Sequence, residues 1–356
     1  MKLIKKQKTK SLIKKLEKTN KLDKQEWLFV LENADSCRKF IIETARKIRD
    51  KSYGKDVFIR GLIEFTNYCR KDCFYCGIRC SNKNASRYRL DRDDILSCCD
   101  EGYLLGFRTF VLQGGEDLHF SDDEMCSIIS LIKEKYPNCA VTLSVGEREK
   151  ETYKRYYDAG ADRFLLRHET ASSEHYSKLH PEGTTLENRM KCLYDLKDIG
   201  FQVGCGMMVG SPHQTNEALA DDMLFIQGFK PHMVGIGPFI SHKDTPFKDE
   251  PNGSADKTIL LVALTRIMLP NVLLPATTAL GTLDDTGREK AILAGANVVM
   301  PNLSPVGVRK KYMIYDNKIS TGDEAAESLE NLKKRIEKIG YNIVESRGDY
   351  NGFVRK

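Results

Sequence analysis

The sequence predicts an α/β protein whose main unit is a parallel (β/α)8 barrel of the TIM type. Two observations support this fold class. Eight β-branched and aromatic runs alternate with amphipathic segments over about 250 residues, which is the length of such a barrel. Polar and glycine-rich motifs follow the ends of these runs, where barrel enzymes gather their chemistry. A doubly wound sheet is the alternative, because strands are counted here from one sequence.

The expected strands are residues 57–65, 107–113, 139–145, 162–167, 201–209, 232–237, 272–278 and 296–300. The expected helices between them lie near 91–106, 121–136, 148–159, 186–199, 215–229, 254–269 and 285–294. Cap-like residues begin several helices, as in Ser121-Asp-Asp-Glu124 and Thr215-Asn-Glu217. Residues 1–50 are expected to form an N-terminal helical extension, 51–320 the barrel, and 321–356 a C-terminal helix (322–340) followed by a polar tail.

Composition is that of an ordinary globular protein, with 30% charged and 41% hydrophobic residues. The net charge of +6 comes from residues 1–24, which hold ten lysines against two acids. We interpret them as a solvated helix face and expect no nucleic-acid partner. No apolar run approaches the roughly 20 residues of a membrane helix, so no membrane partner is expected. Eleven cysteines in a large chain without a secretory pattern predict reduced thiols and a cytoplasmic protein.

Three cysteines follow the first expected strand directly, in the pattern Cys69-x3-Cys73-x2-Cys76. A structural zinc site normally has four ligands, and a ferredoxin-type cluster has four thiolates. Cys80 is the only near candidate for a fourth ligand, and it completes no familiar pattern. Three thiolates on a four-iron cluster leave one iron open to a small molecule, as a catalytic cluster requires. A zinc knuckle or unrelated core cysteines are the alternatives.

Further candidates end the following strands. Gly114 and Gly115 allow close approach to a ligand, and Glu116 could accept hydrogen bonds from an ammonium group. Glu147 could bind a ribose diol and Arg167 a carboxylate, although each alone is typical of a surface ion pair. The histidines show no metal-binding spacing, and Gly204-x-Gly206 and Gly235-x-Gly237 are weak nucleotide signals. Cys205 is expected in the core.

The cysteine motif with Tyr75, followed by Gly-Gly-Glu, resembles the radical S-adenosylmethionine (SAM) superfamily over residues 55–315. Within it, several strings resemble the FeFe-hydrogenase maturase family HydE, and methylornithine synthase is a near relative. These strings are Asn67–Cys73, Leu165–Thr170, Met233–Ile240 with His242 and Asp244–Pro246, Val262–Arg266, Pro275–Ala279 and Ala296–Asn302.

The resemblance implies that Cys69, Cys73 and Cys76 hold one 4Fe-4S cluster whose fourth iron chelates SAM. It implies contacts from Glu116 to the methionyl amine, Glu147 to the ribose, Arg167 to the carboxylate and Met208 to the adenine. Tyr75, Gly114, Gly115 and Ser144 belong to the same implied cofactor site. An electron from the cluster then cleaves the sulfonium to give a 5′-deoxyadenosyl radical.

The resemblance also implies a substrate cavity formed by Arg60, Thr277, Thr278, Met300, Tyr312 and Tyr315. The implied substrate is a small iron–carbonyl–cyanide–cysteine complex, and the implied role is anaerobic assembly of the two-iron subcluster of the H-cluster. The implied partners are other hydrogenase maturases and a flavodoxin- or ferredoxin-type electron donor. Since no cysteine follows Cys205, no second C-terminal cluster is expected. A methylornithine-synthase-like amino-acid mutase and a non-catalytic iron–sulfur scaffold are the alternatives.

Overall fold

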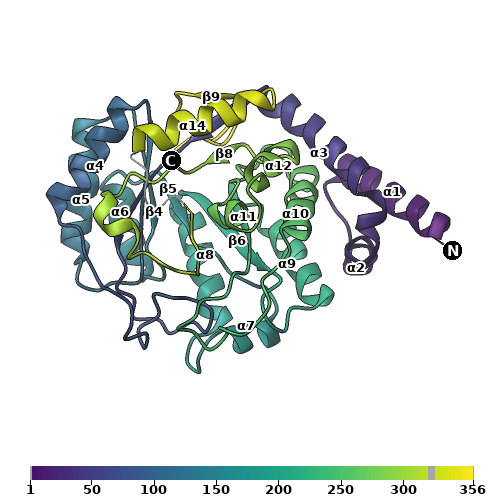
Figure 1. Cartoon of the computed structure of the whole chain (residues 1–356), viewed down its shortest axis with the longest axis horizontal. Helices are drawn as coiled ribbons and strands as arrows, with labels where there is room; N and C mark the ends of the chain where they lie inside the picture. Colours follow the sequence, from purple (N-terminus) through teal and green to yellow (C-terminus); the bar gives the residue numbers. More distant parts are fainter. Residues whose placement is uncertain (1, 320–324, 356) are drawn as a thin grey trace.

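The computed structural model describes residues 2–319 and 325–355. Three helices precede the first strand: α1 (Lys2–Thr19), α2 (Lys24–Asn33) and α3 (Arg38–Tyr53), with a 3-10 turn at Ala34–Cys37. They extend from one side of the molecule (Figure 1). Their apolar faces bury Leu16, Trp27 and Ile41 in the main core. They contact the barrel helices α9 (Asn216–Phe229) and α10 (Ala255–Met268).

The central feature is a six-stranded parallel sheet in chain order. Its strands are β2 (Gly61–Thr66), β3 (Thr109–Gly114), β4 (Ala140–Ser144), β5 (Arg163–Leu165), β6 (Gln202–Val209) and β7 (Met233–Pro238). A second parallel sheet has the order β8 (Val298–Val299), β1 (Asp56–Ile59), β9 (Asn342–Val344). Only Arg60 separates β1 from β2, so the two sheets share one nearly continuous first strand.

Isolated bridges continue the pairing from β7 back to β2. Met233 pairs with Leu273, Pro275 with Val298, and Leu62 with Asn302, all in parallel. The α/β class is therefore confirmed. The arrangement is consistent with a TIM-type barrel, although in the described residues single bridges, not regular strand pairs, link β7 back to β2. The strand expected at 272–278 is wrong as a regular strand. Pro275 has no N–H to donate to a ladder, and Thr277 already caps the next helix.

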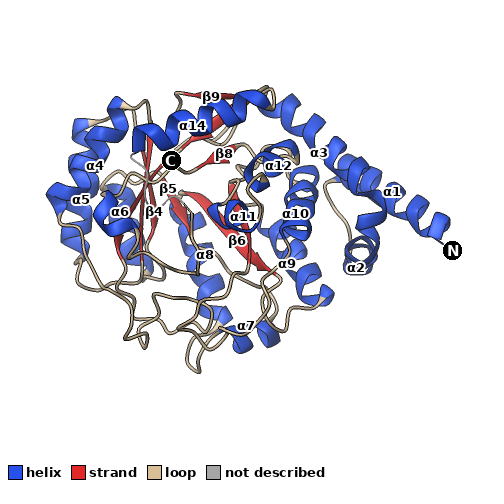
Figure 2. Ribbon diagram, viewed as in Figure 1, coloured by secondary structure: helices blue, strands red, loops and turns tan. Residues whose placement is uncertain are grey.

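Helices surround the sheet on its outer side (Figure 2). They begin at capping residues where the sequence predicts them: Ser121 accepts a bond from Glu124 N, and Thr215 from Ala218 N. Short helices α7, α11 and α13 were not expected. The helices are α4 (Arg92–Leu104), α5 (Asp122–Lys135), α6 (Lys150–Asp158), α7 (Ser173–Leu179), α8 (Leu186–Ile199), α9 (Asn216–Phe229), α10 (Ala255–Met268), α11 (Thr278–Leu283), α12 (Gly287–Leu293), α13 (Val306–Arg309) and α14 (Ala325–Lys338).

Alternation along the strands separates two environments. Ile63 and Phe65 of β2 belong to the large apolar core between sheet and helices. Arg60 and Glu64 occupy the alternate positions, whose side chains point to the other face of the strand. They are buried but lie outside that core, on the inner face of the strands. Cys205 lies in the apolar core, as expected. No helix in the described ranges is both long and apolar enough to cross a bilayer.

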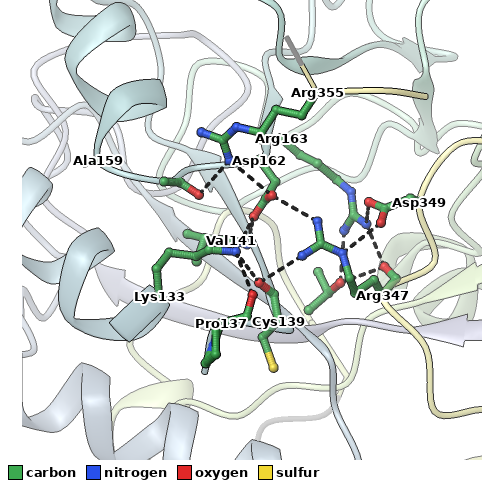
Figure 3. Close-up of polar contacts among 12 residues, drawn as sticks. Lys133, Pro137, Cys139, Val141, Ala159, Asp162, Arg163, Arg347, Asp349 and Arg355 are labelled. Carbon is green, nitrogen blue, oxygen red and sulfur yellow. Dashed lines mark hydrogen bonds and ion pairs between the residues drawn. The ribbon is translucent and has the colours of Figure 1, made fainter. Parts of the chain in front are cut away.

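The C-terminal segment packs against the starts of β4 and β5, where Arg347 and Asp349 lie beside Asp162 and Arg163 (Figure 3). The expectation of a polar tail is wrong at Asn342–Val344, which pair with β1 as strand β9. Beyond β9, Asp349 accepts a bond from Arg163 of β5 at 2.5 Å. Arg347 donates to Asp349 at 2.8 Å and to Asp162 at 2.9 Å. These bonds tie the chain terminus to residues at the amino ends of the strands.

We expect Asp349→Asn to lower the free energy of unfolding by about 2 kcal/mol, because it leaves the buried Arg163 guanidinium without its anionic partner. Burial alone would raise the pKa of Asp349, but Arg163 and Arg347 hold it below its ordinary value. The difference from the wild type should therefore be complete above about pH 4 and shrink as the pH falls further. Urea unfolding at several pH values measures this.

The matched control is Asp198→Asn, since Asp198 pairs with Lys150 at 3.2 Å on the exposed surface. It should change stability by less than about 0.5 kcal/mol at any of these pH values. Equal effects of the two substitutions would contradict a structural role for the C-terminal segment.

Candidate functional site

Cys69, Cys73 and Cys76 lie on the loop that leaves the carboxyl end of β2. Backbone bonds fasten this loop to the end of β3: Glu116 N donates to Cys69 Sγ at 3.3 Å, and Arg70 N donates to Glu116 O at 3.0 Å. Gly115 permits this approach, since a Cβ there would lie 2.1 Å from Tyr68 O. The cysteines and the Gly-Gly-Glu motif therefore form one unit.

The interior of the loop is also fixed. The Arg87 guanidinium donates to the carbonyls of Asn67, Ile78, Arg79 and Asn82. Gly77 N donates to Ile314 O at 2.9 Å, which joins the loop to the segment after β8. The three cysteine side chains are thus held in place by the protein itself, as a bound cofactor requires.

The three thiols are partly buried, and burial raises the pKa of each, to about 12 for Cys73. Metal binding removes the thiol proton regardless of such a pKa. Within the described ranges, no three His, Cys, Asp or Glu side chains converge on a point that one metal ion could occupy. In a four-iron cluster each cysteine binds a different iron, so the thiols need not converge.

The N–H of Glu116 directed at Cys69 Sγ fits a sulfur that carries negative charge, as in a cluster ligand. Cys80 does not belong to this set: it is exposed, and its N–H donates to Lys71 O on the outer side of the loop. The loop therefore fits a cluster with three protein ligands.

Two buried carboxylates continue the site along the rim. Glu116 accepts bonds from Glu147 N at 2.9 Å and from Arg70 Nε at 3.1 Å. Glu147 lies 2.6 Å from Lys71 Nζ and 2.8 Å from Arg189 Nε. Burial alone would raise the pKa of Glu147, but Arg189 and Lys71 lower it below its ordinary value. Glu147 is thus held as a carboxylate.

A cleft of about 300 Å³ opens beside Glu147. Its lining includes Arg70, Arg148, Asn188 and Lys191. A larger open depression of about 610 Å³ lies between the first turns of α4 and α5, and none of the predicted site residues line it. The smaller cleft is therefore the relevant one.

The end of β5 supplies the next group of side chains. Arg167 Nη2 lies 2.9 Å from Met207 O and 3.0 Å from Glu169 Oε2, and its Nε has no partner. Glu169 has a left-handed backbone (φ +64°), held by backbone bonds to Gly206 and Met208. Such strain in a non-glycine residue is typical of functional sites. Arg167 has a free donor and so can bind an additional anionic group.

Among the residues around Glu147 and Arg167, sequence reasoning missed Lys71, Glu169 and Arg189. Arg189 comes from helix α8, is buried, and donates to Arg167 O at 3.3 Å in addition to its contact with Glu147. A lone arginine on a predicted helix gives no signal of this role. Lys71 lies inside the cysteine motif and Glu169 inside the string Leu165–Thr170, and these positions were the available signal.

Tyr75 and Met208 lie together in a small apolar cluster with Phe74, Phe239 and Phe247. The Tyr75 hydroxyl is 3.3 Å from His180 Nε2, while His180 Nδ1 is 2.9 Å from Tyr176 O. Burial lowers the pKa of His180 to about 4, so the ring is neutral, with Nδ1–H donating to the carbonyl and Nε2 accepting from Tyr75. The cluster forms an apolar wall beside the cysteines.

The predicted substrate residues divide into two groups. Arg60 is buried on the inner side of the strands with Nε and Nη2 unpartnered. Burial and then the nearby Arg163 lower the pKa of Arg60. Arg163 Nε and Thr142 Oγ1 are also buried without partners. The sequence analysis did not predict Arg163 or Thr142, because each looks like an ordinary strand residue. These unpartnered donors fit an anionic ligand.

The other predicted substrate residues lie in α11 or in the segments next to α11, β8 and α13. Tyr312 is buried, and its hydroxyl accepts a bond from Gln113 Nε2 at 3.4 Å. Thr277 Oγ1 caps α11, of which Thr278 is the first residue. Tyr315 is half-buried on the same segment as Tyr312, and Met300 packs beside Met233 and Leu273. Gly114 ends β3, and Ser144 ends β4 in register with Gln113.

Comparisons with known proteins place the chain in a family. The family model described as the Radical SAM superfamily matches residues 63–226. The FeFe hydrogenase maturase subunit HydE of Thermotoga maritima is 45% identical over 300 residues, which cover 84% of this chain and 85% of the relative. The 3-methylornithine synthase of Methanosarcina acetivorans is 26% identical over 318 residues, covering 88% and 87%.

Two solved structures share the fold. A methylornithine synthase matches with a TM-score of 0.80 at 24% identity, covering 94% of this chain and 97% of that one. The FeFe-hydrogenase maturase HydG matches with a TM-score of 0.78 at 20% identity, covering 94% and 76%.

Gly115→Ala should impair iron uptake, because a Cβ at 2.1 Å from Tyr68 O forces the cysteine loop away from β3. We expect iron per chain after anaerobic reconstitution to fall severalfold. The control is Gly228→Ala in helix α9, where a Cβ meets nothing within 4 Å. It should bind iron normally and be slightly stabilised, by about 0.5–1 kcal/mol. Normal iron content in the Gly115 variant would show that the contact is not needed.

Proposed function

Since the chain belongs to the FeFe-hydrogenase maturase HydE family of the radical SAM superfamily, we propose that it cleaves SAM reductively to help assemble the two-iron subcluster of FeFe-hydrogenase. The family implies a 4Fe-4S cluster and SAM as cofactors. The observation that carries the proposal is the fixed loop of three cysteines, bonded through Cys69 to the Gly-Gly-Glu end of β3.

Cys69, Cys73 and Cys76 would hold the cluster, with one iron left for SAM. When bound, the cluster supplies the electron that cleaves the SAM sulfonium, and the protein supplies binding and orientation. The Glu116 carboxylate suits the methionyl ammonium. Arg167, with a free Nε and a planar fork, suits the methionyl carboxylate.

Glu147 suits the ribose hydroxyls, because Arg189 and Lys71 keep it ionised beside the cleft. Tyr75 and Met208 offer an apolar wall to the adenine and exclude water from the reacting centre. Gly114, Gly115 and Ser144 complete the strand ends around the cofactor. Arg189 positions Glu147, and Glu169 positions Arg167, through the ion pairs that they form.

The substrate we propose is a small anionic iron complex with carbonyl, cyanide and cysteine ligands, supplied by a partner maturase. Arg60 supports an anion, since two of its buried donors lack partners, and Arg163 and Thr142 add two more. Thr277, Thr278, Met300, Tyr312 and Tyr315 are proposed as the remaining contacts. One cluster, and no second C-terminal cluster, is part of the proposal.

The test is anaerobic. The reconstituted protein, reduced with dithionite and given SAM, should release 5′-deoxyadenosine, and Cys73→Ala should not. Cys80→Ala and Cys205→Ala are matched controls that should keep the activity, because one thiol is exposed and the other lies in the apolar core. No cleavage by wild-type protein that holds about four irons per chain would favour an iron–sulfur scaffold. Conversion of lysine to a methylornithine-type product would favour an amino-acid mutase.

Arg167→Lys should raise the KM for SAM about tenfold, because an ammonium cannot replace the planar two-donor contact with a carboxylate. Iron content should not change, since Arg167 does not contact the cysteine loop in the described contacts. Arg148→Lys is the control: Arg148 lines the cleft beside Glu147, but it donates to the carbonyls of Glu147 and Asp117. Equal KM values for both variants would remove Arg167 from the proposed SAM site.

A further inference from the structure

A strained turn just after β5 carries Glu169 and directly follows Arg167. Thr170 N donates to His168 O at 2.8 Å, which closes a three-residue turn around Glu169. Glu169 has a φ of +64°. A turn of this kind with a positive central φ is the strained form of the γ-turn, and it is rare. Such a conformation persists only where the surrounding structure fixes it, so the turn needs an anchor.

Successive residues of this segment face opposite directions. His168 and Thr170 are fully buried, whereas Arg167 and Glu169 are partly exposed. Arg167 and Glu169 form the ion pair of the site, with 3.0 Å between Nη2 and Oε2. The His168 ring instead packs against Phe225 of helix α9, with 4.8 Å between ring centres. His168 therefore lies on the helix side of the segment, where an anchor can hold it.

Asp222 of α9 contacts this segment on both sides of the turn. Its Oδ1 accepts a bond from Ala171 N at 2.6 Å and lies 3.2 Å from His168 Nε2. His168 Nδ1 accepts a bond from Gly206 N at 3.3 Å, so the ring proton is on Nε2, the atom next to Asp222. One carboxylate oxygen thus contacts the residue before Glu169 and the residue two positions after it.

Stability alone does not account for Asp222. The side chain is fully buried, and its Oδ2 has no hydrogen-bond partner in the described part of the chain. Burial raises the pKa of Asp222, although the nearby His168 opposes the shift. A buried carboxylate with one unpartnered oxygen costs free energy, and an apolar side chain in its place would not have that cost. A residue of this kind beside a strained turn fits a role in the site.

We propose that Asp222 and His168 clamp the turn at Glu169 and thereby position Arg167 and Glu169 for the methionyl end of SAM. The part played by SAM rests on the proposed function. Asp222 and His168 are positioning residues, since they act through the turn. Without the clamp, the turn relaxes toward ordinary backbone angles, and the Arg167–Glu169 pair moves with it. The described bonds of Asp222 and His168 do not include the cysteine loop, so iron binding does not depend on the clamp.

The experiment compares Asp222→Ala, which removes the accepting oxygen, with Asp222→Asn, which keeps an oxygen in the place of Oδ1. In reconstituted, dithionite-reduced protein, Asp222→Ala should raise the KM for SAM about tenfold, with kcat and iron content within about twofold of the wild type. Asp222→Asn should keep the KM within about twofold of the wild type. The control is Ile226→Ala, one turn further along α9 in the apolar core, which also loses a buried side chain but should leave the KM unchanged.

A lower kcat or iron content at an unchanged KM in Asp222→Ala would indicate a merely structural role and would overturn the proposal. An equally high KM in Asp222→Asn would also contradict it, because the accepting oxygen is still present. If Asp222→Ala does not fold, His168→Asn replaces it. The shorter amide keeps an acceptor for Gly206 N but does not reach Asp222, and it should raise the KM about threefold. An unchanged KM in that variant would count against the clamp.

Hydrogen–deuterium exchange of the cluster-free protein gives a readout that needs neither iron nor SAM. The N–H groups of Thr170 and Ala171 bond within the turn and to Asp222, so they should exchange about tenfold faster in Asp222→Ala. Ile226→Ala should leave their exchange as in the wild type. Unchanged exchange in Asp222→Ala would overturn the clamp. Failure of the wild type to cleave SAM would count against the proposed function instead, while the exchange data would still decide whether the clamp holds the turn.

Discussion

The backbone contact between the cysteine loop and the end of β3 is the interaction on which the site depends. It joins Cys69 Sγ to Glu116 N–H, and Gly115 is the residue that lets the two segments meet. Parallel strands place all their carboxyl ends at one rim, so a loop fastened there also lies near Glu147 and Arg167. Residues far apart in sequence are therefore gathered at the same rim as the three thiols.

Charge is distributed differently at the rim and on the inner face of the strands. At the rim, Glu116 and Glu147 are balanced by Arg70, Lys71 and Arg189, and this suits a cofactor with both ammonium and carboxylate groups. Inside, Arg60 and Arg163 keep unpartnered donors although burying such donors costs free energy. That imbalance suits an anionic ligand. The two regions thus suit ligands of different charge.

Most of the fold could be predicted, because strand periodicity is local. The meeting of the cysteine loop with Gly-Gly-Glu could also be predicted, because both motifs are contiguous and follow neighbouring strands. The residues that were missed depend on long-range contacts. Arg189 acts through Glu147 from another element, and Lys71 reaches Glu147 across 76 positions. Strand β9 has only three residues and exists because β1 offers a free edge. The expected strand at 272–278 failed because Pro275 interrupts its ladder.

The central claim is that three cysteines leave one iron of the cluster open to SAM. The most direct test is pulsed electron–nuclear double resonance on the dithionite-reduced, reconstituted protein with SAM labelled by ¹⁵N at the methionyl amine. This account predicts a ¹⁵N hyperfine coupling large enough to require bonding to iron, together with a changed cluster signal when SAM is added. A signal that SAM leaves unchanged, with no ¹⁵N coupling, would contradict it.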